Sequence, residues 1–217
     1  MESISNSEYR LLSKGAGILS KDNKGDKVLH LRDGSLLKLF RIKHLISTAR
    51  FYPYSLRFVN NAKKLCVLNI PTVEIIKYFK IPSINRTAVQ YRKLEGETLP
   101  TYLSHKKLTE ELAQKFGSFI ATLHNKGVYF RSIHLENVIV LPDESFGLID
   151  VSDMKIFSHS LSLWMRNGNF RHLTRYETHR DLLKSALIPF IQAYMRQSNI
   201  SKRQRLKLRQ RLLKHFR

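Results

Sequence analysis

The chain has 217 residues, of which 42% are hydrophobic, so it can form one large domain or two packed lobes and is not a disordered protein. Its 38 Lys and Arg against 17 Asp and Glu give a formal charge of +21. This charge predicts a polyanionic neighbour, either nucleic acid, an anionic lipid surface or a phosphorylated glycan, and cannot choose among them.

The first predicted elements are three strands, at residues 17–20, 27–31 and 35–40. Asp33-Gly34 predicts a tight turn between the second and third strands. A basic turn that contains Gly25 joins the first two, and it matches the phosphate-binding pattern G-x-G-x-x-G poorly.

Lys38 lies in the third strand between Leu37 and Leu39. Because side chains alternate between the faces of a strand, Lys38 faces away from both leucines. Two interpretations stay open: an edge lysine on a solvated face, or a lysine over a cleft.

A helical stretch is expected between His44 and Asn69, interrupted or entered at Pro53. Its buried stripe is predicted to comprise Ala62, Leu65 and Leu68. The single cysteine, Cys66, excludes an intramolecular disulfide, and we expect it to be a small buried residue.

A further strand at 87–93 is followed by L-E-G-E-T-L, a turn suited to a connector between two lobes. Next comes a helix from Thr109 to Lys126, because Thr109 can cap its start and Gly127 can end it. Its predicted core face comprises Leu112, Phe116, Phe119, Ile120 and Leu123.

Residues 127–150 carry the strongest chemical signal. Strands at 138–141 and 146–149, with a turn at 142–144, predict an apolar hairpin. Asn137 and Asp150 then stand at adjacent strand ends, where their two oxygen ligands could share one divalent cation.

Beyond this hairpin, residues 182–194 predict an apolar helix that is interrupted or restarted near Pro189. The last seventeen residues contain eight Lys or Arg and no acid, and an apolar residue recurs every four positions at Leu208, Leu212 and Phe216. This pattern predicts a basic amphipathic helix. Either it packs on the core with a solvated basic face, or it contacts an anionic membrane, where each basic residue contributes roughly 1 kcal/mol.

The strings H-N-K-G-V-Y-F-R-S-I-H-L-E-N-V-I-V, L-I-D-V-S-D-M and L-R-D-G-S-L-L-K-L-F-R-I-K resemble bacterial kinase-like proteins of the lipopolysaccharide core kinase and toluene-tolerance group. The resemblance covers about residues 15–180. It implies an α+β protein with a small bilobal protein-kinase-like fold, in which residues 1–93 form a lobe with an antiparallel sheet and residues 94–217 a mainly helical lobe. It also implies ATP, Mg²⁺ and an acceptor hydroxyl on an inner-core sugar.

The resemblance also implies roles for particular residues. Lys38 would contact the nucleotide phosphates beneath the hairpin that contains Gly25, and backbone groups near Tyr91 and Leu94 would meet the adenine edge. Asn137 and Asp150 would hold the metal.

The chain departs from the kinase pattern H-R-D-x-x-x-x-N. Ser132 stands where the catalytic aspartate belongs and Phe130 where the histidine belongs. General-base help is worth roughly 10²–10⁴-fold, so its loss slows phosphoryl transfer without necessarily abolishing it. The D-F-G triplet is also changed, to Asp150-Val151-Ser152.

A second departure concerns the glutamate that pairs with the strand lysine in kinases. No acidic residue occurs between Asp33 and Glu74, so a neutral partner for Lys38, Asn60 or Asn61, is expected.

Three neighbours of the missing aspartate have alternative roles. His134 is either a substitute base or a structural histidine that hydrogen-bonds the loop. Arg131 either orients an acceptor phosphate or braces the loop, and Asp153 is either a supporting carboxylate or a turn residue.

Three functional hypotheses follow. The first is an ATP-dependent phosphotransferase for a lipopolysaccharide inner-core sugar or related envelope glycolipid, and the second is a pseudokinase that binds nucleotide or serves as a scaffold. A basic kinase associated with RNA is a minor third, because no nucleic-acid reading motif is recognisable and no specific nucleic-acid partner is expected.

The expected location follows from the apolar pattern. No apolar run approaches the roughly 18 residues of a membrane span. We expect a cytoplasmic protein without a transmembrane segment. The resemblance and the positive charge further imply an anionic glycolipid or membrane surface as partner, with the protein peripheral on the inner membrane. The oligomeric state is left open.

Overall fold

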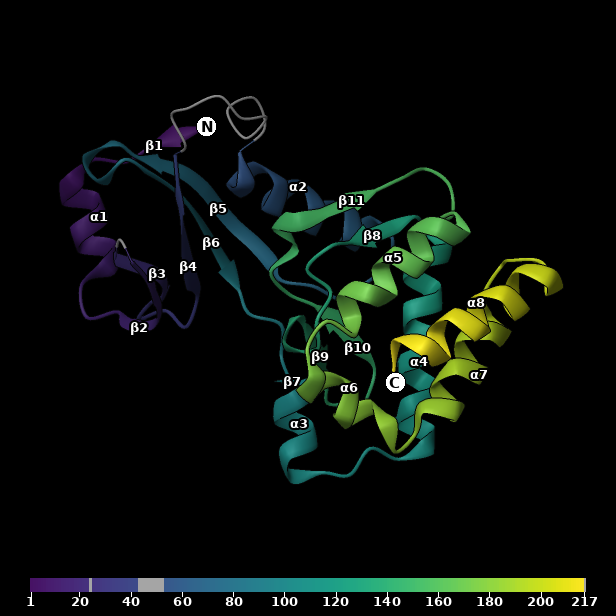
Figure 1. The fold of residues 1–217 in the computed structure, drawn as a ribbon. Coiled ribbons are helices and arrows are strands. Elements are labelled where there is room, and N and C mark those ends of the chain that lie inside the picture. Colours follow the sequence, from purple (N-terminus) through teal and green to yellow (C-terminus); the bar gives the residue numbers. More distant parts are fainter. Residues whose placement is uncertain (24, 43–52, 217) are drawn as a thin grey trace.

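The computed structural model describes residues 1–23, 25–42 and 53–216, and it has the α+β class and the two lobes expected from the sequence (Figure 1). The first lobe is a six-stranded sheet in the order β1-β5-β6-β4-β3-β2. Its strands are β1 (Glu2–Ser3), β2 (Gly17–Asp22), β3 (Gly25–His30), β4 (Leu36–Arg41), β5 (Glu74–Ile81) and β6 (Arg86–Arg92). The sheet is antiparallel as expected, except that β1 pairs with β5 in parallel.

The two faces of this sheet are covered differently. One face carries a small core that includes Leu37 and Leu39, against which residues of helix α1 (Asn6–Ser13) pack. Helix α2 (Tyr54–Val67) covers the other face and belongs to the large core that continues into the second lobe. Lys38 lies on this second face, in a strand with a neighbour on either side, so the interpretation as an edge lysine is wrong.

Helix α2 confirms part of the expected helical stretch. It begins directly after Pro53, and residues 43–52 of the expected stretch lie outside the described residues. Ala62 and Leu65 are buried as predicted, and Leu68 is half-buried. The prediction of a buried Cys66 is wrong, because the helix turns this residue outward into solvent.

The second lobe is mainly helical, with α4 at its centre (Figure 1). Its helices are α3 (Leu99–His105), α4 (Glu110–Asn125), α5 (Leu163–Leu173), α6 (Glu177–Lys184), α7 (Leu187–Gln197) and α8 (Lys202–His215). Short strands β7 (Glu97–Thr98), β8 (Val128–Phe130), β9 (Val138–Val140), β10 (Phe146–Leu148) and β11 (Met154–Ile156) and the 3-10 turns η1 (Pro82–Ile84), η2 (Leu135–Asn137) and η3 (Val151–Asp153) complete the chain.

Helix α4 confirms its prediction in detail. The hydroxyl of Thr109 accepts the Leu112 amide at 3.1 Å, and Gly127 follows the helix with a φ of 77°. Gly117 lets α4 approach α7 closely, because a Cβ there would lie 2.2 Å from the carbonyl oxygen of Phe190. Helix α4 therefore packs directly against the backbone of α7 at the centre of the lobe.

The connector between the lobes depends on one glycine. Gly96 has a φ of 120°, and a Cβ at this position would lie 2.1 Å from the carbonyl oxygen of Val140. Only glycine accommodates both the backbone angle and the contact. The turn therefore brings β7 against β9 of the hairpin.

The C-terminal helices differ from their prediction only in where the chain breaks. The break between α6 and α7 falls at Ser185-Ala186, and Pro189 lies in the first turn of α7, where its missing N–H costs no helical hydrogen bond. Helix α8 buries Leu208 and Leu212 against the core, and Phe216, which directly follows the helix, is buried there too. Among the described residues, no helix has the length and the apolar run that crossing a bilayer requires.

Candidate functional site

Lys38 and Asp150 form an ion pair between the lobes. Lys38 Nζ lies 2.6 Å from Asp150 Oδ1, although the two residues are 112 positions apart in the sequence. Lys38 is 6% exposed, whereas the Asp150 side chain keeps 39% of its surface accessible. The lysine is therefore enclosed, and the carboxylate faces a cavity.

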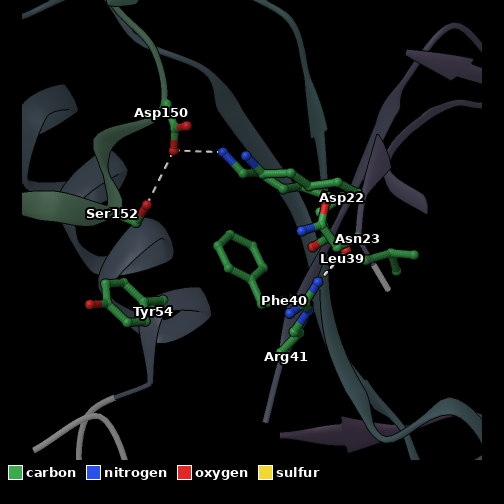
Figure 2. A pocket seen from close by; sticks show the side chains of 10 residues that line it. Asp22, Asn23, Leu39, Phe40, Arg41, Tyr54, Asp150 and Ser152 are labelled. Atoms are coloured by element: carbon green, nitrogen blue, oxygen red, sulfur yellow. Dashed lines mark hydrogen bonds and ion pairs between the residues drawn. The ribbon is translucent and has the colours of Figure 1, made fainter. Parts of the chain in front are cut away.

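That cavity has a volume of about 550 Å³, within the usual range for small-molecule sites. It is lined by Asp22, Asn23, Lys27, Lys38, Leu39, Phe40, Arg41, Tyr54, Asp150 and Ser152. Figure 2 shows Asp150 and Ser152 on one side and Asp22, Asn23 and Arg41 on the other. The β2-β3 hairpin is held there by an ion pair between Asp22 and Arg41.

The two charges of the pair shift each other's pKa. Burial lowers the pKa of Lys38 below its ordinary value, against the opposing effect of Asp150. Burial acts to raise the pKa of Asp150, but the Lys38 charge and the hydrogen bonds from Lys38 and Ser152 outweigh it, so this pKa is lowered. The short contact favours the ionised pair.

Lys38 has no glutamate partner from helix α2, and two aromatic rings lie beside it instead. Lys38 Nζ lies 5.3 Å from the ring centre of Phe58 on α2 and 5.7 Å from that of Phe40. A ring face attracts a cation, and it does so more strongly where water is excluded. These two rings and Asp150 therefore surround the Lys38 ammonium group, and the sequence did not predict either ring as its neighbour.

Asn61 has a different role from the one expected. Its Nδ2 donates to the backbone oxygen of Val151 at 2.7 Å and to that of Met154 at 3.2 Å. This amide therefore ties α2 to the turn after Asp150, and the proposed Asn61–Lys38 contact is wrong. The other candidate, Asn60, is placed in α2, and its pairing with Lys38 stays a prediction.

The predicted hairpin brings Asn137 and Asp150 to adjacent strand ends. β9 and β10 pair with Val138 opposite Leu148, and the amide of Ile149 donates to the carbonyl oxygen of Asn137 at 3.1 Å. Asp150 itself has a φ of 51°, an uncommon backbone conformation for a residue with a side chain. Such strain concentrates at ligand sites.

Each of these two residues keeps one side-chain oxygen available. Asn137 Nδ2 donates to the carbonyl oxygen of Ser132 at 2.8 Å and to His134 Nε2 at 3.2 Å, so both of its protons are used. Asp150 uses Oδ1 for Lys38 and Ser152. Among the described residues, neither Asn137 Oδ1 nor Asp150 Oδ2 has a hydrogen-bond partner.

These two oxygens fit magnesium. Mg²⁺ prefers oxygen ligands and is usually bound by one or two protein groups together with substrate phosphates. Within the part of the chain that the structure describes, no group of three His, Cys, Asp or Glu residues could hold a metal by itself.

His134 is arranged as a structural histidine. Because its Nε2 accepts the Asn137 amide, the neutral ring carries its proton on Nδ1, which is buried and has no partner among the described residues. Burial lowers the pKa of His134, which favours this neutral form. The lone pair that a general base needs is therefore occupied, and His134 positions Asn137.

Arg131 and Ser132 both contact Asp153. The Arg131 guanidinium holds Oδ1 through two nitrogens, one of them Nε at 3.0 Å, and Ser132 Oγ lies 3.4 Å from Oδ2. Arg131 thus braces the loop. The sequence predicts Asp153 as a supporting carboxylate or a turn residue, and in the structure its carboxylate lies beside Ser132, at the position of the missing aspartate.

Of the sequence-predicted site residues that the structure describes, only Lys38 and Asp150 line the cavity. Asn137, His134, Ser132 and Arg131 lie outside its lining.

The three other candidates for nucleotide contact also lie outside this lining. Gly25 closes the β2-β3 hairpin opposite Asp22, with a φ of 113°. Tyr91 is buried, with its ring centre 5.4 Å from that of Phe58, and burial raises its pKa. Leu94 packs over Gly147, where an added Cβ would lie 2.3 Å from its Cδ2. Their nucleotide contacts stay predictions.

Comparison of the chain with models of known protein families finds no match, and comparison with curated proteins finds none either. The resemblance to lipopolysaccharide core kinases therefore continues to rest on the motifs themselves.

Proposed function

We propose that the protein is a kinase-like ATP-dependent phosphotransferase. The observation that carries this proposal is the convergence of Lys38 and Asp150 at one cavity, with Asn137 at the adjacent strand end. Catalysis of phosphoryl transfer is mainly positioning and charge stabilisation. It therefore depends on a protein cation that contacts the phosphates and on free oxygens that bind a metal, and the site has both.

Each group has a separate task in this reaction. Lys38 would exchange its contact with Asp150 for the nucleotide phosphates, while Asp150 Oδ2 and Asn137 Oδ1 would hold Mg²⁺. The metal would neutralise charge on the phosphates. An acceptor hydroxyl then forms a bond to the γ-phosphorus, the bond from that phosphorus to the bridging oxygen breaks, ADP leaves, and the hydroxyl proton passes to solvent or to a nearby base.

The proposed acceptor is an inner-core sugar of lipopolysaccharide or a related anionic envelope glycolipid, met at the cytoplasmic face of the inner membrane. The charge of +21 supports an anionic partner. Helix α8 supports a membrane location, because its apolar side is buried and its solvent side carries Lys202, Arg203, Lys207, Arg209, Arg211 and Lys214.

One observation favours a second candidate, a pseudokinase that binds nucleotide without turnover. Ser132 replaces the catalytic aspartate, and the lone pair of His134 is occupied by Asn137. Asp153 is the only carboxylate that the described residues bring into contact with Ser132, and Arg131 already pairs with it.

The test combines transfer and binding. Purified protein is incubated with γ-labelled Mg-ATP and inner-core glycolipid, and its thermal midpoint is measured with and without Mg-ATP. We expect labelled glycolipid, and Asp150→Asn should reduce transfer about 10²-fold or more. Asp181→Asn is the matched control, because it removes the same charge from an exposed residue of α6.

The outcomes separate the two candidates. Stabilisation by Mg-ATP that is lost in Asp150→Asn, without any transfer, supports the pseudokinase and overturns the enzyme. If Mg-ATP does not stabilise the wild-type protein, both candidates fail.

A further inference from the structure

A second cavity is lined in part by the loop that precedes Asn137. It has a volume of about 380 Å³ and is distinct from the cavity at Lys38, since the two share no lining residue. Its lining includes Arg131, Ser132, His134, His172, Arg175 and Tyr176, together with Asp153. The residues come from three places in the chain, namely the loop after β8, the turn η3, and the last turn of α5 with the segment that joins it to α6.

The charges in this cavity favour an anion. Asp153, the one carboxylate among the described residues that line it, is already paired with Arg131, which leaves Arg175 uncompensated. The guanidinium of Arg175 makes no hydrogen bond or ion pair with the described residues. A guanidinium presents several donors in a planar fork that matches a phosphate group.

Two neutral groups add donors beside Arg175. Burial lowers the pKa of His172, and the positive charges of Arg171 and Arg175 lower it further, so its surroundings are electropositive. Tyr176 is ordered by edge-on ring contacts with His134 at 5.8 Å and with His179 at 5.1 Å between centres. Its hydroxyl makes no hydrogen bond within the described residues.

The cavity is also adjacent to the proposed transfer site. Ser132 and His134 form part of its wall, and both accept hydrogen bonds from the side chain of Asn137. An acceptor bound here would contact residues that hydrogen-bond Asn137, one of the two proposed metal ligands.

We propose that this cavity binds a phosphate monoester group carried by the acceptor, with Arg175, His172 and Tyr176 as its ligands. The role as an acceptor site rests on the proposed phosphotransferase function, whereas the binding of phosphate does not. The net charge of +21 attracts an anionic acceptor from a distance, and Arg175 would bind its phosphate group by direct contact.

The experiment measures binding without turnover, by isothermal titration calorimetry at fixed ionic strength. The probes are glucose 6-phosphate, inorganic phosphate, glucose, and phosphatidylcholine vesicles with and without phosphatidic acid. Glucose 6-phosphate should bind and glucose should not. Because a hydrogen bond to a charged group is worth about 1.5–3 kcal/mol, Arg175→Gln should weaken binding about tenfold or more.

The matched control is Arg10→Gln, which removes the same charge from an exposed residue of α1 in the first lobe that does not line the cavity. It should change affinity less than about twofold. Tyr176→Phe is a second variant that keeps the ring contacts and removes only the hydroxyl, and it should weaken binding severalfold. Thermal midpoints of all three variants should stay near the wild-type value.

Two outcomes overturn the proposal: no binding of any phosphate-bearing probe, or equal losses in Arg175→Gln and Arg10→Gln. Binding of phosphatidic acid vesicles but not of glucose 6-phosphate, lost in Arg175→Gln, supports the phosphate site and assigns its source to a lipid headgroup. The two proposals can fail separately, because Mg-ATP binding is measured through Asp150→Asn and phosphate binding through Arg175→Gln.

Discussion

Two buried cations, Lys38 in the cleft and Arg166 in the helical lobe, are held by opposite means. Lys38 meets a carboxylate whose side chain is 39% exposed. Arg166 is 0% exposed and meets only neutral oxygens, at 2.7–3.2 Å. These acceptors are the Leu161 carbonyl, the Tyr194 hydroxyl and the side-chain oxygens of Asn125 and Asn199.

The contacts of Arg166 continue as one directed chain of hydrogen bonds. Arg166 donates to Tyr194 Oη, and this hydroxyl lies 2.8 Å from His124 Nδ1. His124 Nε2 lies 2.9 Å from Asn169 Oδ1, and Asn169 Nδ2 donates to the carbonyl oxygen of Phe130 at 2.6 Å. The chain of bonds is consistent with a neutral His124 that carries its proton on Nε2.

This difference shows which of the two cations is able to bind an anionic ligand. Every acceptor around Arg166 belongs to the scaffold, and the network ends at Phe130, next to the loop of Arg131 and Ser132. No incoming anion can replace these acceptors without leaving the buried oxygens of Leu161 and Tyr194 unsatisfied. Asp150, by contrast, can be hydrated or can turn to another cation, so Lys38 is free to exchange partners.

The largest effect is expected for Arg166→Met. It keeps the stem of the side chain but removes the donor from two buried acceptors, the Leu161 carbonyl and the Tyr194 hydroxyl, and from two accessible amide oxygens, so the free energy of unfolding should fall by about 3–5 kcal/mol. Urea unfolding measures this. Arg171→Met, at an exposed position of the same helix, should stay within about 0.5 kcal/mol of wild type. A loss below about 1 kcal/mol in Arg166→Met would contradict the scaffold role.

A smaller, pH-dependent effect is expected from His124. Burial lowers its pKa to about 3, mainly because a charged ring would be desolvated. The unfolded chain, with a pKa near 6.5, takes up the proton first, so stability is fully present above about pH 6.5 and falls as the pH drops toward 3. The slope is about 1.4 kcal/mol per pH unit.

His124→Gln removes this titration while keeping an amide in the network. Between pH 6.5 and 5 the wild type should lose about 2 kcal/mol more than the variant, measured by urea unfolding at each pH. His30→Gln, at an exposed position of β3, should keep the wild-type pH dependence. Parallel curves for wild type and His124→Gln would show that the network does not depend on a neutral ring.

The sequence predicted the cleft better than the scaffold, for a physical reason. The face of Lys38 follows from strand alternation, and the ends of the hairpin follow from turn residues, which are local signals. The burial of Arg166 depends on acceptors that lie 28 to 41 residues away, so a basic residue in a polar stretch gave no sign of it.

Other misses have the same origin. Asn61 reaches backbone oxygens that lie 90 and 93 residues later, and Phe58 has the spacing of an ordinary core residue. Helix α1 was not predicted, although the sequence carries a local signal for it. Ser5 and Glu8 form the S-x-x-E capping box at its start. The two residues of β1 carry no periodicity that a sequence reading could use.

The smallest change in stability is expected for Lys38→Met, although its effect on ligand binding should be large. A methionine fits between Phe40 and Phe58 and makes favourable sulfur contacts with aromatic rings. The burial that lowers the pKa of Lys38 shows that the buried charge is unfavourable, and methionine carries no charge. Asp150 loses its partner but can be hydrated, so unfolding in urea without ligand should change by no more than about 1 kcal/mol.

Stabilisation by Mg-ATP should be lost in the same variant, because the cation that meets the phosphates is gone. Lys63→Met, on the exposed side of α2, should keep both the stability and the response to Mg-ATP. If Lys38→Met instead unfolded as readily as Arg166→Met, Lys38 would be a second scaffold cation, and its short contact with Asp150 would bind the lobes together. Stability and ligand response therefore have to be measured on the same variant, because only their separation distinguishes a cation that a ligand can use from one that the fold requires.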